Sequence, residues 1–457
     1  MSGDALLTRD QAKALADRVL TFSTADETRV NIASTWSGNT RFADSSITTS
    51  GGSADVSVTV TVTLGKRRAS ASTNVLDDDS LKRTVERALT LARLSPEDPE
   101  LMPELGPQTY PTINAFVDRT ADLDPEVRNA AAKRAIESAT DAGKAAGRVF
   151  TAGYLEANAR AVAVATSKGL FAYHRATDGN FSMTSRTPDG TGSGWGSAGA
   201  RDWGKVDPSG IGRIAAQKAV ASRNPQPIEP GPYVAILEPQ AATDLVSLIN
   251  RSLSARAADE GRSPFAKPGG GNRIGEKVVD ERLTLYSDPA DATLLGDPFD
   301  EQGLPRRRIV WIEKGVLKNL AYDRTWARRQ KKPPTPATTN MSLMMEGSDT
   351  SVEQMIKTTK RGLLVTFFWY IRAVDQPSLL NTGMTRDGLF LIENGEITGP
   401  VQNFRWNMSP LVAYNNITAV GRPVPIHTGE SYDGPGTALV PPVRVEDFFM
   451  TSISPAV

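Results

Sequence analysis

The sequence predicts an α+β fold of two domains, each with an antiparallel sheet packed by helices. Residues 54–64 alternate strictly between apolar and polar side chains, as a half-buried antiparallel strand does. Helical stripes, with apolar residues three and four positions apart, recur in both halves of the chain. Residues 224–232 contain four prolines in nine positions. We therefore place a boundary there, between a domain of residues 1–226 and one of residues 227–457.

The size and charge of the chain narrow the classes of protein to which it can belong. At 457 residues and 49.1 kDa it is long for a single hydrophobic core, which favours two domains. Its 52 basic and 52 acidic residues leave no net charge, so we expect no nucleic acid and no membrane as a partner. The sequence has no cysteine, which excludes disulfides and thiolate chemistry.

The beginning of the chain does not have the pattern of a secretory signal. It mixes charged residues with leucines at helical spacing and lacks an apolar stretch. The longest apolar run, Leu363 to Ile371, is far too short to span a bilayer. We therefore expect a soluble, cytoplasmic protein.

The N-terminal half is predicted to combine helices with a hairpin-rich sheet. Ala157 and Asn158 are expected to form a turn between two of its strands. The expected elements are a helix at 10–19, strands at 28–36 and 54–64, helices at 81–94 and 125–147, strands at 148–156, 160–166 and 169–176, and a helix at 209–222.

Two segments of this half resemble functional motifs. The aspartates 77–79 could form a metal loop, but no further acidic residue follows at calcium-loop spacing, so a helix-capping cluster is the better interpretation. The glycine-rich segment 189–204 lacks the Gly-Lys-Ser/Thr of a phosphate loop. Neither Ser193 nor Ser197 has the flanking glycines of a nucleophile elbow. A glycine-rich loop or a β-turn is expected there.

The C-terminal half begins with a short buried strand and an amphipathic helix. Pro239 suits the first turn of this helix, and Gly261 can end it. The expected elements are a strand at 233–237, the helix at 239–260, a strand within 276–289, hairpins about Lys314-Gly315 and Asn394-Gly395, a helix at 352–361 and a strand at 363–371.

Five segments stand out by their order along the chain. They are TRFADSSI at 40–47, DPFDEQGLPRRRIVWIEKGVLKNLAYDRTWARR at 297–329, SVEQMIKTTKRGLLVT at 351–366, GLFLIENGEITGPVQNFRW at 388–406 and LVPPVRVEDF at 439–448. In this order they resemble the TldD/PmbA family of peptidases, in which a TldD subunit is paired with a PmbA (TldE) subunit. The resemblance spans nearly the whole chain, although no single piece is a sharp catalytic motif.

The resemblance also shows where a zinc site would fall. In the TldD type a helix bears His-Glu-x-x-x-His, with two zinc-binding imidazoles and a glutamate that acts on the metal-bound water. An ungapped comparison places these positions on Val246, Ser247 and Arg251, none of which can replace the family residue. This departure is typical of the PmbA/TldE type. It implies a subunit with no catalytic residues and no metal of its own, beside a TldD-type partner that carries zinc.

The family's third zinc ligand is a cysteine near the C-terminus, which this chain lacks. His427 lies in about the right region and is a weak candidate for contact with a metal. The only other histidine, His174, falls in the expected N-terminal sheet. A lone histidine is more often a hydrogen-bonded structural residue than a ligand.

The resemblance implies peptides as the substrate, with this chain forming an interface and one wall of the substrate chamber. A second hypothesis is a homodimeric peptide-binding or scaffold protein that kept the fold without protease activity. A third is an active peptidase with an unrecognised site, for which Asp77 to Asp79 and Asp300-Glu301 are the acidic clusters to probe. Arg251 could pair with a carboxylate of the partner or of its own helix.

Overall fold

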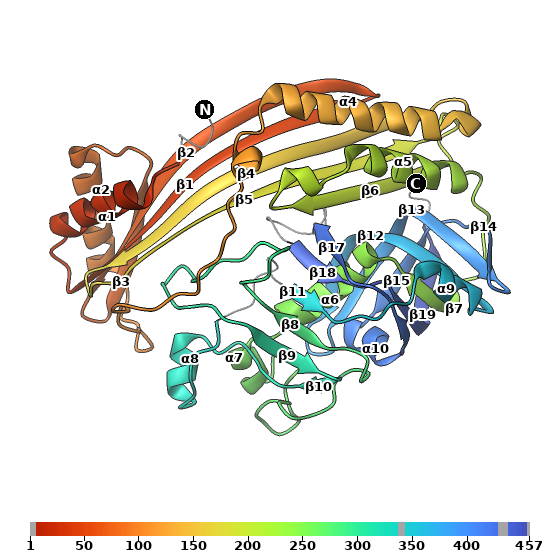
Figure 1. Ribbon diagram of the computed structural model, residues 1–457. Helices are drawn as coiled ribbons and strands as arrows, with labels where there is room; N and C mark the ends of the chain where they lie inside the picture. The colour runs from red at the N-terminus through yellow and green to blue at the C-terminus, as the bar shows by residue number, and fades with distance from the viewer. Residues whose placement is uncertain (1–5, 337–342, 428–436, 455–457) are drawn as a thin grey trace.

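The structure is a computed structural model that describes residues 6–336, 343–427 and 437–454. A long curved sheet from the N-terminal half arches over a C-terminal half that holds two further sheets (Figure 1). Helices and strands are mixed along the chain, which confirms the predicted α+β class. No helix within the described ranges is long and apolar enough to cross a membrane.

Among its described residues, the N-terminal half has one sheet and five α-helices. The strands are β1 (Glu27–Ala43), β2 (Ser46–Leu64), β3 (Arg67–Thr73), β4 (Phe150–Thr166), β5 (Phe171–Arg186) and β6 (Ser193–Ala200); the helices are α1 (Arg9–Phe22), α2 (Asp78–Leu94), α3 (Asp118–Ala121), α4 (Pro125–Ala142) and α5 (Pro208–Ala221). The sheet has the order β3-β2-β1-β4-β5-β6 and all its pairs are antiparallel. Helices α1 and α2 cover one end of a face, and α4 and α5 cover the other end (Figure 1).

The aspartates at 77–79 begin helix α2. Asp77 is the N-cap, and its carboxylate accepts hydrogen bonds from Ser80 N at 2.8 Å and from Ser80 Oγ at 2.9 Å. Asp78 and Asp79 lie in the first turn, where negative charge favours the helix dipole. The interpretation of this cluster as a helix cap is therefore confirmed.

Strand β4 does not follow the prediction. The turn expected at Ala157 and Asn158 does not form, because β4 is one strand of 17 residues that runs through both. Asn158 pairs with Ser37 of β1 on one side and with Asp178 of β5 on the other. Hydrogen-bonded ladders on both edges and the burial of Ala157 outweigh the local turn preference of Asn158.

The prediction of a glycine-rich loop or β-turn at 189–204 is wrong for residues 193–200, which form strand β6, and holds for the turn that precedes this strand. The glycines of this strand allow helix α5 to approach closely. A Cβ atom at Gly194 would lie 2.3 Å from the carbonyl oxygen of Ala215 and 2.5 Å from the nitrogen of Ala219. These glycines therefore serve helix–sheet packing, and their spacing alone does not distinguish that use from flexibility.

The C-terminal half contains thirteen strands and five helices among its described residues. The strands are β7 (Gly231–Leu237), β8 (Leu285–Ser287), β9 (Ile309–Glu313), β10 (Val316–Leu317), β11 (Leu343–Met345), β12 (Arg361–Asp375), β13 (Leu380–Glu393), β14 (Glu396–Pro400), β15 (Phe404–Met408), β16 (Ile417–Val420), β17 (Val424–His427), β18 (Thr437–Val440) and β19 (Val443–Ile453). The helices are α6 (Pro239–Arg251), α7 (Ala255–Asp259), α8 (Arg324–Arg329), α9 (Val352–Lys357) and α10 (Pro410–Asn415).

These strands form a seven-stranded and a six-stranded sheet. In the larger sheet, β12 pairs with both β7 and β13, so the path β12-β7-β19-β15-β13 closes on itself. The smaller sheet has the order β10-β9-β8-β11-β18-β17. The pairs β7–β12 and β11–β18 are parallel, and each joins segments far apart in the sequence.

Both predicted hairpins of this half are confirmed. Lys314 and Gly315 have φ angles of 47° and 77°, and Asn394 and Gly395 have φ angles of 51° and 85°. Two successive positive φ angles are the mark of a type I′ turn, which matches the twist of the flanking strands. The strand expected within 276–289 is reduced to the three residues of β8.

The helix predicted at 239–260 is divided in two, because α6 ends at Arg251 and α7 begins at Ala255. Ser254 caps α7 by accepting a hydrogen bond from Ala257 N at 3.3 Å. Ala321 N donates to Leu253 O at 2.7 Å, and Ala255 N donates to Ala321 O at 2.9 Å. The apolar spacing continues through the break, so a sequence pattern alone does not reveal it.

Close packing of helices α4 and α5 generates the first prediction. A Cβ atom at Gly212 would lie 2.1 Å from the carbonyl oxygen of Ala135, which belongs to the backbone of α4 and cannot swing away. We expect Gly212→Ala to lower the free energy of unfolding by about 1–3 kcal/mol, as overpacking does. Gly399→Ala is the control, because a Cβ atom there meets nothing within 4 Å. Urea unfolding measures both, and equal effects would contradict the packing argument.

Candidate functional site

Helix α6, where the zinc motif of the TldD type would fall, lies between the two C-terminal sheets (Figure 1). It contacts β12 and β7 of one sheet and β18 and β17 of the other. Leu245 and Ile249 belong to the main hydrophobic cluster of this half. Pro239 occupies the first turn, where its missing N–H costs no hydrogen bond.

The three positions compared with the zinc motif lie in different environments. Val246 and Ser247 are fully buried, and Val246 packs within the hydrophobic core. Arg251 is exposed in the last turn of α6, where a cation favours the helix dipole. A valine, a serine and an arginine do not fit the imidazole and carboxylate donors that zinc takes. In the described parts of the chain, no group of three or more His, Asp or Glu side chains is placed to hold a metal ion.

A buried carboxyl group on the same helix was not singled out from the sequence. Asp244 is fully buried, and Gln240 Nε2 donates a hydrogen bond to its Oδ1 at 3.4 Å. Burial raises the pKa of Asp244 well above its usual value, and the positive charge of Arg251 acts in the opposite direction. The sequence left two carboxylate partners open for Arg251, one on the partner subunit and one on its own helix. The attraction between Arg251 and Asp244 supports the partner on its own helix.

The exposed end of α6 opens into a cleft of about 470 Å³. Its walls are the end of α6, the start of α7, residues 262–264 and the hairpin of β12 and β13. Three arginines line it, Arg251, Arg262 and Arg372, against one carboxylate, Asp375. Asp375 accepts hydrogen bonds from the nitrogen and hydroxyl of Ser378, which lower the pKa of Asp375. The lining therefore has an excess of positive charge.

Strand β12 brings one of its edges to this cleft. Strand β7 pairs with β12 only from Leu363 to Val365, whereas β12 continues to Asp375. Within the described ranges, no strand pairs with that edge from residue 367 onward. Tyr370 has a φ of 54° at an irregularity in the pairing with β13. A strand edge without a neighbour can accept an extended peptide through backbone hydrogen bonds.

The two histidines lie in separate parts of the fold. His427 ends strand β17, and its side chain is outside the described part of the structure. His174 lies on β5, in the N-terminal sheet, and is 6% exposed. Its Nε2 atom is 3.8 Å from Asp297 Oδ1. Burial lowers the pKa of His174 to about 4, so its imidazole is neutral at pH 7.

The remaining acidic cluster, Asp300-Glu301, belongs to a turn. Asp300 Oδ1 accepts hydrogen bonds from the nitrogens of Gln302 and Leu304, both at 2.9 Å. The carbonyl oxygen of Glu301 accepts a hydrogen bond from Asn31 Nδ2 at 2.7 Å, which ties this turn to strand β1. These hydrogen bonds give Asp300 and Glu301 a structural role in the turn.

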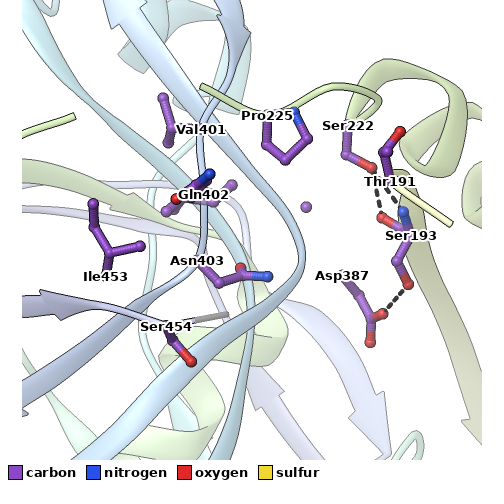
Figure 2. A pocket seen from close by; sticks show the side chains of 12 residues that line it. Thr191, Ser193, Ser222, Pro225, Asp387, Val401, Gln402, Asn403, Ile453 and Ser454 are labelled. Carbon is purple, nitrogen blue, oxygen red and sulfur yellow. Dashed lines mark hydrogen bonds between the residues drawn. The ribbon is translucent and has the colours of Figure 1, made fainter. Parts of the chain in front are cut away.

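A second cavity, of about 340 Å³, is lined by residues of both the N-terminal and the C-terminal half (Figure 2). At one side, Ser193 Oγ donates a hydrogen bond of 2.5 Å to Asp387 Oδ1 (Figure 2). Ser222 Oγ donates to Ser193 O at 2.8 Å. Ser193 is 4% exposed, and no described histidine lines the cavity, so this serine has no imidazole beside it to act as the base of a serine nucleophile. The bond instead ties β6 to β13.

The buried carboxyl group of Asp244 gives a prediction about pH. Because the folded state binds this proton more tightly, the contribution of Asp244 to stability is fully present below the unfolded pKa of about 4. It is lost as the pH rises through the folded pKa. We expect Asp244→Asn to change stability little near pH 4 and to stabilise the protein relative to wild type at higher pH. The gain is about 1.4 kcal/mol for each unit of pKa shift.

Urea unfolding of wild type and Asp244→Asn across this pH range measures the effect. Asp55→Asn, at an exposed position on β2, is the control for the same change of side chain outside the core. A pH-independent difference for Asp244→Asn would show that burial does not raise the pKa of this carboxyl group.

Comparison with known proteins covers most of the chain. Family profiles match residues 30–92 as PmbA/TldA metallopeptidase domain 1, residues 115–223 as the central domain and residues 230–452 as the C-terminal domain. The metalloprotease PmbA of Escherichia coli O157:H7 is 22% identical over 409 residues, 86% of each chain. A metalloprotease of Methanocaldococcus jannaschii is 24% identical over 204 residues, which cover 40% of this chain and 42% of that relative.

The fold is similar to that of a solved structure, TldE from Thermococcus kodakarensis. The TM-score is 0.85 at 19% identity, over 96% of this chain and 99% of that one. At this identity the likeness concerns the fold alone. The three profile matches follow one another along the sequence and leave few residues outside them. This chain therefore belongs to the PmbA/TldD metallopeptidase family.

Proposed function

We propose that this chain is a non-catalytic, TldE/PmbA-like subunit of a heterodimeric TldD/TldE-type zinc metallopeptidase that processes or degrades peptides. One observation carries the proposal: the helix that would bear the zinc motif is intact, but presents Val246, Ser247 and Arg251 at the compared positions. Zinc would then be held by the TldD-type partner. A chain without cysteine is compatible with the reducing cytoplasm, where we place the assembly.

In this proposal the chain contributes one wall of the substrate chamber. An extended peptide could add to the edge of β12 through backbone hydrogen bonds, while its acidic side chains or terminal carboxylate meet the arginines of the cleft. A homodimeric peptide-binding or scaffold protein would use the same cleft. The two functions differ only in the partner, so the partner is the first thing to identify.

Native purification from the source cells tests the proposal. Metal content and co-purifying proteins are measured on the same sample. We expect a chain without zinc, accompanied by a sister protein that bears His-Glu-x-x-x-His, and a complex that cleaves peptides faster than the sister protein alone. A stable homodimer without that partner would support the scaffold function. Stoichiometric zinc in the isolated chain, or no gain in cleavage on complex formation, would refute the proposal.

The charge of the cleft predicts a preference for acidic peptides. In the reconstituted complex, we expect Arg372→Gln to raise KM for an acidic peptide about three- to fivefold, which corresponds to roughly 1 kcal/mol for a partly exposed charge pair. The kcat should change little, because Arg372 lies in the wall formed by this chain. Arg328→Gln, at an exposed position on α8, is the control.

A neutral peptide of the same length separates charge from shape in this experiment. Its KM should be the same for wild type and Arg372→Gln. An equal loss for neutral and acidic peptides would mean that the variant distorts the hairpin of β12 and β13, and that guanidinium charge does not select the substrate.

A further inference from the structure

A third cavity, of about 250 Å³, lies between the N-terminal sheet and a loop of the C-terminal half. Its sheet side comes from β1, β2 and β4, on the face opposite to the helices, where Asn31 and Ala33 alternate with the core residues Val30 and Ile32. Its other side is the loop 297–306. The cavity is separate from the cleft beside Arg251, since no residue lines both.

Two arginines, Arg160 and Arg306, and three carboxylates, Asp297, Asp300 and Glu301, line this cavity. Arg160 is held by Asp297, with distances of 2.7 Å from Nη2 to Oδ1 and 3.4 Å from Nη1 to Oδ2. The closest approach of Arg306 to the same carboxylate is 3.7 Å, from Nη1 to Oδ2, which is too long for a hydrogen bond. Asp297 therefore pairs with Arg160 and leaves Arg306 as the second cation.

Arg306 leaves two buried nitrogens of its guanidinium group without a hydrogen bond to any described residue. Its side chain is only 17% exposed. Its Nε and Nη1 atoms are buried and have no hydrogen-bond partner among the described residues. A buried polar donor without an acceptor costs about 1–3 kcal/mol, and a charged donor costs more. Both atoms are out of contact with solvent, so an acceptor in the cavity would reach them only after the Arg306 side chain turns toward it.

We propose that this cavity binds a small molecule with a single carboxylate, which accepts hydrogen bonds from Arg306. A guanidinium and a carboxylate match in planar geometry and in charge. Asp300 and Glu301 also line the cavity, and their charge disfavours a phosphate dianion. Val162, Val164 and Phe299 offer an apolar surface for an aliphatic chain.

Two sources of this chemistry fit the cavity, and they differ at the amino group. A simple carboxylic acid would use Arg306 and the apolar surface only. The carboxylate could also belong to a free α-amino acid or to the carboxyl-terminal residue of a short peptide. A free α-amino acid would in addition place its ammonium near Asp300 or Glu301. A ligand at this position would touch both halves of the chain and would stabilise their contact by mass action.

Isothermal titration calorimetry on the isolated chain at neutral pH tests the proposal, with L-leucine, N-acetyl-L-leucine, L-leucinamide and sodium sulfate as probes. We expect saturable binding with one site for at least one of the two carboxylates. Leucinamide and sulfate should bind at least tenfold more weakly, a difference of about 1.4 kcal/mol. Preference for leucine indicates an amino acid as the source, and preference for the acetylated compound indicates a simple acid.

Variants localise the binding. Arg306→Gln should weaken it at least tenfold, whereas Arg307→Gln, an exposed neighbour, should leave it unchanged. Ala33→Phe fills the cavity from the sheet side and should abolish binding even if Arg306→Gln does not fold. The proposal is wrong if neither carboxylate binds at millimolar concentration, if sulfate or leucinamide binds equally well, or if Ala33→Phe binds normally. No partner subunit is needed, so the result is independent of the proposed peptidase function.

Discussion

The burial of helix α6 is the constraint on which the C-terminal half depends. Both sheets pack against this one helix, and most of its side chains, polar ones included, are withdrawn from water. Burial of Asp244 raises its pKa, and the positive charge of Arg251 at the end of the helix opposes that shift. A helix in this position can expose chemistry only at its end, where Arg251 reaches the cleft. In the proposed function, a chain without the zinc motif would keep a packed core with a charged surface beside it.

Polar pairs connect the two halves of the chain, and each half contributes one residue to each pair. The hydrogen bond from Ser193 to Asp387 joins β6 to β13. The ion pair of Arg160 with Asp297 joins β4 to the loop that follows β8. Both pairs are largely desolvated, which strengthens them and makes the loss of either partner costly.

In the proposed function, the separation of core from cleft would let a family member without the zinc motif keep its fold. Val246 adds apolar contacts where an imidazole would stand, and Ser247 is small enough to be enclosed. In the proposed function, the strand edge of β12 and the arginines of the cleft would remain useful to a peptide that is cut by another subunit. Binding and catalysis would then be divided between two chains of one architecture.

Local chemistry let the sequence alone determine the α+β class, the alternating strand within β2, the cap at Asp77 and both type I′ hairpins, because each depends on neighbouring residues. The resemblance to the TldD/PmbA family supplied the family and the positions on α6 that are compared with the zinc motif. Tertiary structure decided that β4 runs straight through Asn158, that glycines of β6 pack against α5 and that α6 stops at Arg251. It also decided which charges meet, since Arg306 and Asp297 converge with Arg160 from the other half of the chain. Such contacts depend on long-range pairing and burial, which spacing along a chain does not encode.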